Sequence, residues 1–108
     1  LYNYFMNTIY LKNPDVIFRK IADEFVLVPI RQKAVDLKSI YTLNEVGAFI
    51  WELIDGAKTT TQIRDRVVEG FEIDPSGAEA DITAILSQLE SLGLIRIAWQ
   101  PSPLSHSP

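Results

Sequence analysis

The hydrophobic period of the chain changes once, close to Asn44, and this change limits the folds that the chain can adopt. Before that point, apolar residues occur in short runs rich in β-branched and aromatic types, which is typical of strands. After it, they recur every three to four residues, which is typical of amphipathic helices. A length of 108 residues suits one small domain. The sequence therefore predicts an α+β domain whose strands precede its helices.

Three strands are expected in the first half of the chain. Residues 16–21 and 24–30 are separated by Ala22-Asp23, a dipeptide suited to a tight hairpin turn. Pro29 has no N–H to donate, so it should lie near a strand end or on a sheet edge. Residues 35–43 alternate in polarity, and the face expected to be buried holds Val35, Leu37, Tyr41 and Leu43. Ile40 is the apolar exception on the opposite, polar face.

Three helices and a short strand are expected to follow. The helices are predicted over residues 45–54, over residues 62–70 and from residue 75 to Gly93, each preceded by capping residues: Asn44, the threonines at 59–61, and Asp74. The third carries an apolar stripe of Ala78, Ile82, Ile85, Leu86 and Leu89. Residues 94–98 read as the final strand. Two helices joined by a brief turn and followed by a strand are the layout of a winged helix-turn-helix.

The two ends of the chain are expected to lie outside the domain, which spans residues 15–98. Met6 would make a natural start, so residues 1–5 are interpreted as foreign to the native chain, within an N-terminal extension of residues 1–14. That extension is a tag, an added strand or a dimer contact. Residues 99–108, rich in Pro and Ser, are expected to be disordered.

The composition provides few of the side chains that catalysis and metal binding commonly use. The chain has no cysteine and a single histidine, His106, in the tail. Thiolate zinc sites, disulfides and cysteine nucleophiles are therefore excluded, and we expect no catalytic residue, no metal and no cofactor. No apolar run is long enough for a membrane span, and the N-terminus has no basic region typical of a signal peptide. A cytoplasmic protein is the expectation.

Charge is distributed unevenly and argues against nucleic acid as a partner. Residues 1–44 hold six Lys/Arg and four Asp/Glu, a balance of +2, whereas residues 45–91 hold three and ten, a balance of −7. Residues 74–92, where a DNA-reading helix would lie, contain no Lys or Arg. Such a helix would approach DNA without the phosphate contacts that supply most nonspecific affinity. A winged-helix DNA-binding or transcriptional module is kept as the alternative function.

The third predicted strand would allow the chain to bind a peptide instead of DNA. A strand at a sheet edge offers unpaired N–H and C=O groups to another chain, and an extended peptide can bind by adding a strand there. Asp36 and Lys38 would limit indiscriminate pairing, and Ile40 would offer an apolar contact.

Two segments resemble the PqqD-like family: YTLNEVGAFIWELIDGAKT at residues 41–59 and LSQLESLGLI at residues 86–95. The resemblance covers roughly residues 15–97. It implies a small winged-helix domain called a RiPP recognition element, which catalyses nothing, binds the leader segment of a ribosomally made precursor peptide and presents it to a modifying enzyme. For the namesake of the family, that enzyme is a radical S-adenosylmethionine enzyme in pyrroloquinoline quinone biosynthesis.

The resemblance also implies where the peptide binds, namely beside the third strand in a groove shared with the third helix. The residues carried over to this groove are Leu37, Lys38, Ser39, Ile40, Tyr41, Thr42, Ala78, Asp81, Ile82 and Ile85. A monomer and a homodimer are both compatible with the sequence. A third reading, besides the adaptor and the DNA-binding module, is a detached domain that supports a kinase or synthetase without touching peptide.

Overall fold

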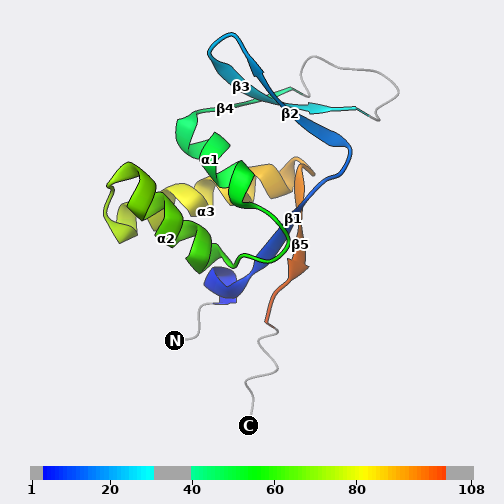
Figure 1. Ribbon diagram of the computed structural model, residues 1–108. Coiled ribbons are helices and arrows are strands. Elements are labelled where there is room, and N and C mark those ends of the chain that lie inside the picture. The colour runs from blue at the N-terminus through cyan, green and yellow to red at the C-terminus, as the bar shows by residue number, and fades with distance from the viewer. Residues whose placement is uncertain (1–3, 31–39, 102–108) are drawn as a thin grey trace.

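The computed structural model describes residues 4–30 and 40–101 of the chain. These residues form, in order, η1 (Tyr4–Asn7), β1 (Ile9–Lys12), β2 (Val16–Ile21), β3 (Glu24–Pro29), β4 (Tyr41–Leu43), α1 (Glu45–Leu53), α2 (Thr60–Phe71), α3 (Pro75–Ser91) and β5 (Ile95–Trp99). The predicted α+β fold is confirmed, with a three-stranded antiparallel sheet, three helices and a short closing strand. In Figure 1 the sheet stands above the helices, while β1 and β5 run down beside them.

The hairpin of the three-stranded sheet forms as predicted. β2 and β3 pair antiparallel from Ile21 opposite Glu24 to Val16 opposite Pro29. Ala22 in the connecting turn takes the left-handed backbone conformation, with a φ of 55°, that a two-residue connection of this kind requires. Pro29 is the last residue of its strand, so no ladder hydrogen bond is lost inside the sheet.

The third strand of this sheet is described over a shorter stretch than the sequence predicts. β4 pairs with β3 through Tyr41, Thr42 and Leu43. Leu43 is buried, Tyr41 is half-buried and Thr42 is exposed, which matches the predicted alternation. Ile40, immediately before the strand, is half-buried. Residues 31–39, and with them most of the predicted strand 35–43, lie outside the described residues.

All three helices begin at the predicted caps. The side chain of Asn44 accepts a hydrogen bond from the Gly47 N–H at 2.7 Å. Thr59 and Gln62 form a reciprocal capping box at the start of α2. Asp74 accepts from the Gly77 N–H at 3.0 Å, and Pro75 takes the first position of α3.

The N-terminal segment forms a strand that the sequence left as one of three alternatives. β1 pairs antiparallel with β5, and Met6, Thr8 and Tyr10 are buried. The backbone is tied to the helical part by hydrogen bonds from the Thr60 N–H to the Thr8 carbonyl at 3.0 Å and from Gly56 N–H to the Tyr10 carbonyl at 3.1 Å. Residues 4–12 are therefore packed against the domain.

The packed part of the chain also extends beyond residue 98, the predicted C-terminal boundary of the domain. Trp99, the first residue of the predicted disordered tail, ends β5, and Pro101 is buried. Residues 102–108, including His106, lie outside the described residues. None of the helices in residues 4–30 and 40–101 combines the length and apolar character needed to cross a membrane.

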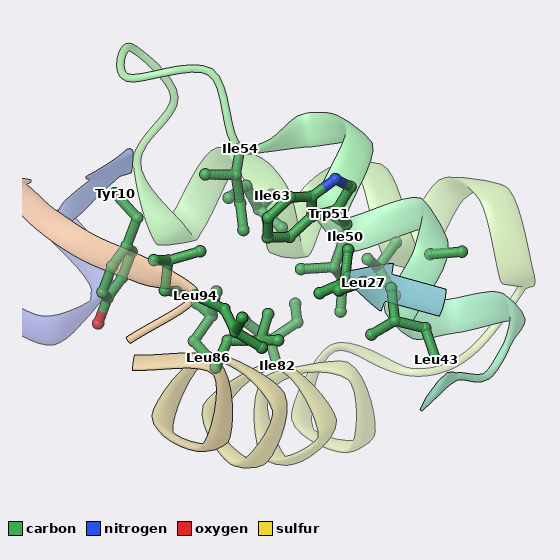
Figure 2. Close-up of a cluster of buried hydrophobic side chains, with 14 of the residues drawn as sticks. Tyr10, Leu27, Leu43, Ile50, Trp51, Ile54, Ile63, Ile82, Leu86 and Leu94 are labelled. Atoms are coloured by element: carbon green, nitrogen blue, oxygen red, sulfur yellow. The ribbon is translucent and has the colours of Figure 1, made fainter. Parts of the chain in front are cut away.

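The hydrophobic core lies between α3 and a layer made by α1 and α2 (Figure 2). α3 supplies its predicted stripe at spacings of three and four, and the fully buried members are Ala78, Ile82, Leu86 and Leu89. Ile50 and Trp51 enter from α1, and Ile63 and Val67 from α2. Leu27 extends the core to the three-stranded sheet, and Tyr10 extends it to β1.

The buried Tyr10 phenol predicts a loss of stability in alkali. Burial, and secondarily the negative charge of Glu90, raise the pKa of Tyr10 to about 12, whereas an exposed tyrosine has a pKa of 10.0. The unfolded chain therefore releases this proton at a lower pH than the folded chain. The stabilisation is complete below pH 10 and lost as the pH rises through 12, a change of about 2 to 3 kcal/mol.

Urea unfolding at pH 8 and pH 11.5 measures this contribution. The Tyr10→Phe variant should lose distinctly less stability between the two pH values than the parent chain. Tyr41→Phe, which changes a half-buried phenol on β4, is the matched control. An equal alkaline loss in the parent chain and in Tyr10→Phe would contradict the assignment.

Candidate functional site

Among the described residues, the three-stranded sheet has an open edge at β4. The strand order is β2-β3-β4, so β4 has a neighbour on one side only. Within the described residues, no strand pairs with its outer side. An edge strand directs alternate N–H and C=O groups away from its sheet, where a second chain can meet them.

A hollow of about 210 Å³ lies next to this edge, between the start of α1 and the middle of α3. Its walls are Asn44 and Val46 on one side and Asp81, Ala84 and Ile85 on the other. Asn44 directly follows β4, so the hollow is continuous along the chain with the edge strand. We call the edge of β4 together with this hollow the β4–α3 groove.

The chemistry of the β4–α3 groove is apolar with one acidic group. Val46, Ala84 and Ile85 present aliphatic surface, and Asp81 is exposed. Asn44 uses its side-chain oxygen to cap α1, whereas its NH2 group has no hydrogen-bond partner in the part of the chain that the structure describes. The groove thus offers surface for an apolar side chain, a carboxylate for a cation and an amide donor for a carbonyl.

Gly47 holds the strand end close to α1. A Cβ atom at this position would lie 3.1 Å from Leu43 Cδ2 and 3.2 Å from the Asn44 side-chain oxygen. Any larger residue would therefore press on both the end of β4 and the cap of α1. Gly47 lets the chain turn from strand to helix within a single residue, Asn44, and so fixes the edge strand against the helices.

The predicted site residues fall into four groups. Asp81 and Ile85 line the groove, and Ile40, Tyr41 and Thr42 lie on or beside the edge strand. Ala78 and Ile82 have no exposed surface, because they belong to the core stripe of α3. They lie beneath the groove and cannot contact a bound chain in this structure. The remaining predicted residues, Leu37, Lys38 and Ser39, lie outside the described residues.

Three residues of the hollow were missed by the sequence reasoning, and two of them carried a signal. Ala84 follows Asp81 by three positions, which places both on one helix face. Asn44 comes directly after the edge strand, but the sequence analysis assigns it only as the N-cap of α1. Val46 resembles any other apolar residue of α1, and only the fold shows that it faces the hollow.

Metal-binding side chains do not gather in the part of the chain that the structure describes. No group of three or more His, Cys, Asp or Glu side chains among them is placed to hold a metal ion. The side chains that line the hollow include one ionisable group, the Asp81 carboxylate.

The fold and the groove together define a small winged-helix domain of the α+β class with an open strand edge. The chain belongs to the PqqD family, because the family model for coenzyme PQQ synthesis protein D (PqqD) matches residues 24–95. No curated protein matches the chain. None of the matches is a DNA-binding protein, so the DNA-binding alternative receives no support.

Two solved structures share the fold. One is TbiB1 in complex with the TbiA(beta) leader peptide, at 24% identity and a TM-score of 0.64, covering 80% of this chain and 94% of the other. The second is lasso peptide synthetase B1 complexed with the leader peptide, at 18% identity and a TM-score of 0.66, covering 81% and 96%.

Proposed function

We propose that this chain is a non-enzymatic adaptor that binds the leader segment of a ribosomally synthesised precursor peptide and presents it to a modifying enzyme. The observation that carries the proposal is the open edge of β4 beside the hollow of α3. Membership of the PqqD family supports it, as do two structural neighbours that are complexes with leader peptides. The leader would bind as an added strand, its backbone pairing with β4 and its side chains reaching the hollow.

The chemistry of the groove indicates what the leader carries. The apolar walls made by Val46, Ala84 and Ile85 suit one aliphatic or aromatic anchor. The exposed Asp81 at the same hollow favours a basic or polar residue next to that anchor. Ile40, half-buried immediately before β4, adds apolar surface for the same segment. An extended leader with an apolar anchor and a basic or polar neighbour that reaches the same hollow fits these features.

The modifying enzyme and the assembly state belong to the same proposal. The family resemblance points to a radical S-adenosylmethionine enzyme as the class of modifying enzyme. An isolated domain that binds the leader as a monomer is sufficient for this role, and a homodimer is compatible with it as long as the edge of β4 stays free. Co-purification with the enzyme encoded beside the chain would identify the partner.

Charge changes in the groove should weaken leader binding. Ile40→Glu removes apolar contact and places a charge against it, so we expect Kd for the leader to rise about tenfold or more. Asp81→Lys reverses the one charge of the hollow and should raise Kd several-fold. Fluorescence anisotropy of a labelled leader, taken from any precursor peptide found encoded beside the chain, measures both effects.

Glu90→Lys is the matched control, because it makes the same kind of change on α3 at an exposed position outside the hollow. It should leave leader binding within about twofold of the parent chain. Absence of leader binding by the parent chain, or binding that neither groove variant alters, would overturn the proposed function. Retention on duplex DNA that falls with salt would favour the winged-helix alternative.

A further inference from the structure

A second hollow, of about 350 Å³, opens on another part of the molecule. It lies between the β2–β3 hairpin, α1 and the end of α2, and shares no lining residue with the β4–α3 groove. Four of the five phenylalanines of the chain line it: Phe18, Phe25, Phe49 and Phe71. Two glutamates, Glu45 and Glu52, complete the wall with Ala48. We call this site the aromatic hollow.

The rings of the aromatic hollow are held by one another. Phe18 and Phe25 stack with centroids 5.7 Å apart, and Phe49 meets Phe71 edge to face at 5.2 Å. All four side chains are only partly buried, although phenylalanine favours the core. The four rings pack against the edge of the core and leave part of their surface in the hollow, where another molecule can contact it.

Gly70 preserves the space around Phe49. It is the second-last residue of α2. A Cβ atom at this position would lie 3.3 Å from Cζ of the Phe49 ring. An alanine would therefore press on the Phe49 ring, which would have to move by a few tenths of an ångström.

The two glutamates make the aromatic hollow acidic. They are seven residues apart on α1, which places them on one face about two turns from each other. Both are exposed, and among residues 4–30 and 40–101 neither has an ion-pair partner. The lining residues include no cation. Nearby, the Lys20 ammonium lies 5.5 Å from the Phe25 ring centre, so that ring already accepts a cation.

We propose that the aromatic hollow binds an arginine side chain of a protein partner. The guanidinium would be held by Glu45 and Glu52 while its planar group and methylene stem pack on the phenylalanine rings. Arginine suits this site better than lysine, because its planar guanidinium both stacks on aromatic rings and forms forked hydrogen bonds to carboxylates. The site goes beyond the proposed leader binding and does not depend on it.

Fluorine NMR of the full chain tests this proposal. With 4-fluorophenylalanine at all five phenylalanine positions, four resonances report on the hollow and Phe5, in η1, reports on the rest of the fold. The probe is acetyl-Leu-Arg-Leu-amide, and its partner is the same peptide with the neutral isostere citrulline. The arginine probe should shift the four resonances of the hollow, leave Phe5 unchanged and bind several-fold more tightly than the citrulline probe.

Variants test whether the Glu45 and Glu52 carboxylates cause the preference for the arginine probe over the citrulline probe. The double variant Glu45→Gln/Glu52→Gln should weaken binding of the arginine probe about fivefold, whereas Glu90→Gln, the matched control, should not. Ile40→Glu in the β4–α3 groove should leave probe binding unchanged, so the outcome is independent of the leader experiment. Equal binding of the two probes, or no shift of the four resonances, would overturn the proposal.

Discussion

Replacing Ile82 by alanine is expected to lower the free energy of unfolding by about 3 kcal/mol. The Ile82 side chain has no exposed surface and lies in the core stripe of α3. Truncation removes buried methyl groups and leaves a cavity that the surrounding helices fill only in part. For a domain whose total stability is of the order of 5 to 15 kcal/mol, this is a large loss, and urea unfolding measures it directly.

Ile85→Ala is the matched control, since it makes the same change one turn further along the same helix. Ile85 is half-buried and lines the β4–α3 groove. Its truncation should cost roughly half as much stability and should weaken leader binding several-fold. Folded Ile82→Ala should bind the leader with nearly the parent affinity. The reverse pattern, in which Ile82→Ala loses binding without losing stability, would show that the groove is misplaced.

Deletion of residues 1–12 is expected to abolish cooperative folding. The deletion removes η1 and β1, and with them the buried side chains of Met6, Thr8 and Tyr10. Loss of a buried aromatic side chain alone costs about 3 to 5 kcal/mol. The deletion also leaves β5 without its only described neighbour and removes the backbone hydrogen bonds to Gly56 and Thr60. Thermal unfolding followed by circular dichroism is the measurement.

Deletion of residues 1–3 alone is the control and should leave the melting temperature close to that of the parent chain. The point variant Tyr10→Ala should lie between the two, with a folded but strongly destabilised domain. A shortened chain lacking residues 1–12 that still unfolds cooperatively at the parent temperature would contradict the role of β1 in the core.

The parts of the fold that the sequence predicted are those decided by neighbouring residues. Asn44, Thr59 and Asp74 each cap a helix through a hydrogen bond to a backbone N–H three residues ahead. Such a bond depends on a short polar side chain and on the backbone next to it, so a few letters of sequence suffice to find it. The Ala22-Asp23 turn is local in the same way.

The pairing of β1 with β5 could not be predicted from neighbouring residues in the sequence. Ile9 and Trp99 are opposite each other although 90 positions separate them in the chain. Residues 9–12 read IYLK, with no alternation to show which face is buried. Only the structure shows that β1 pairs with β5 and is hydrogen-bonded to Gly56 and Thr60. The chain was therefore divided at residue 14 on composition, whereas the packing begins before residue 9.

The predicted site was limited by the geometry of α3. Ala78 and Ile82 were carried over as part of a helix that flanks the groove, but the apolar stripe to which they belong faces inward. Asp81 and Ala84 stand on the outward face, beside the half-buried Ile85. The resemblance identifies α3 as the helix that flanks the groove, but it does not identify which face of α3 is exposed. The spacing of the apolar stripe does, because residues that belong to the stripe face the core.

Isotope-edited NMR tests most directly the proposed binding of the leader as a strand along β4. The chain is labelled with ¹³C and ¹⁵N, the leader is unlabelled, and nuclear Overhauser effects between the two are recorded. We predict backbone contacts from the leader to Tyr41 and Thr42, and side-chain contacts to Val46 and Ile85. Contacts confined to the aromatic hollow or to β5, with none to β4, would contradict this binding mode.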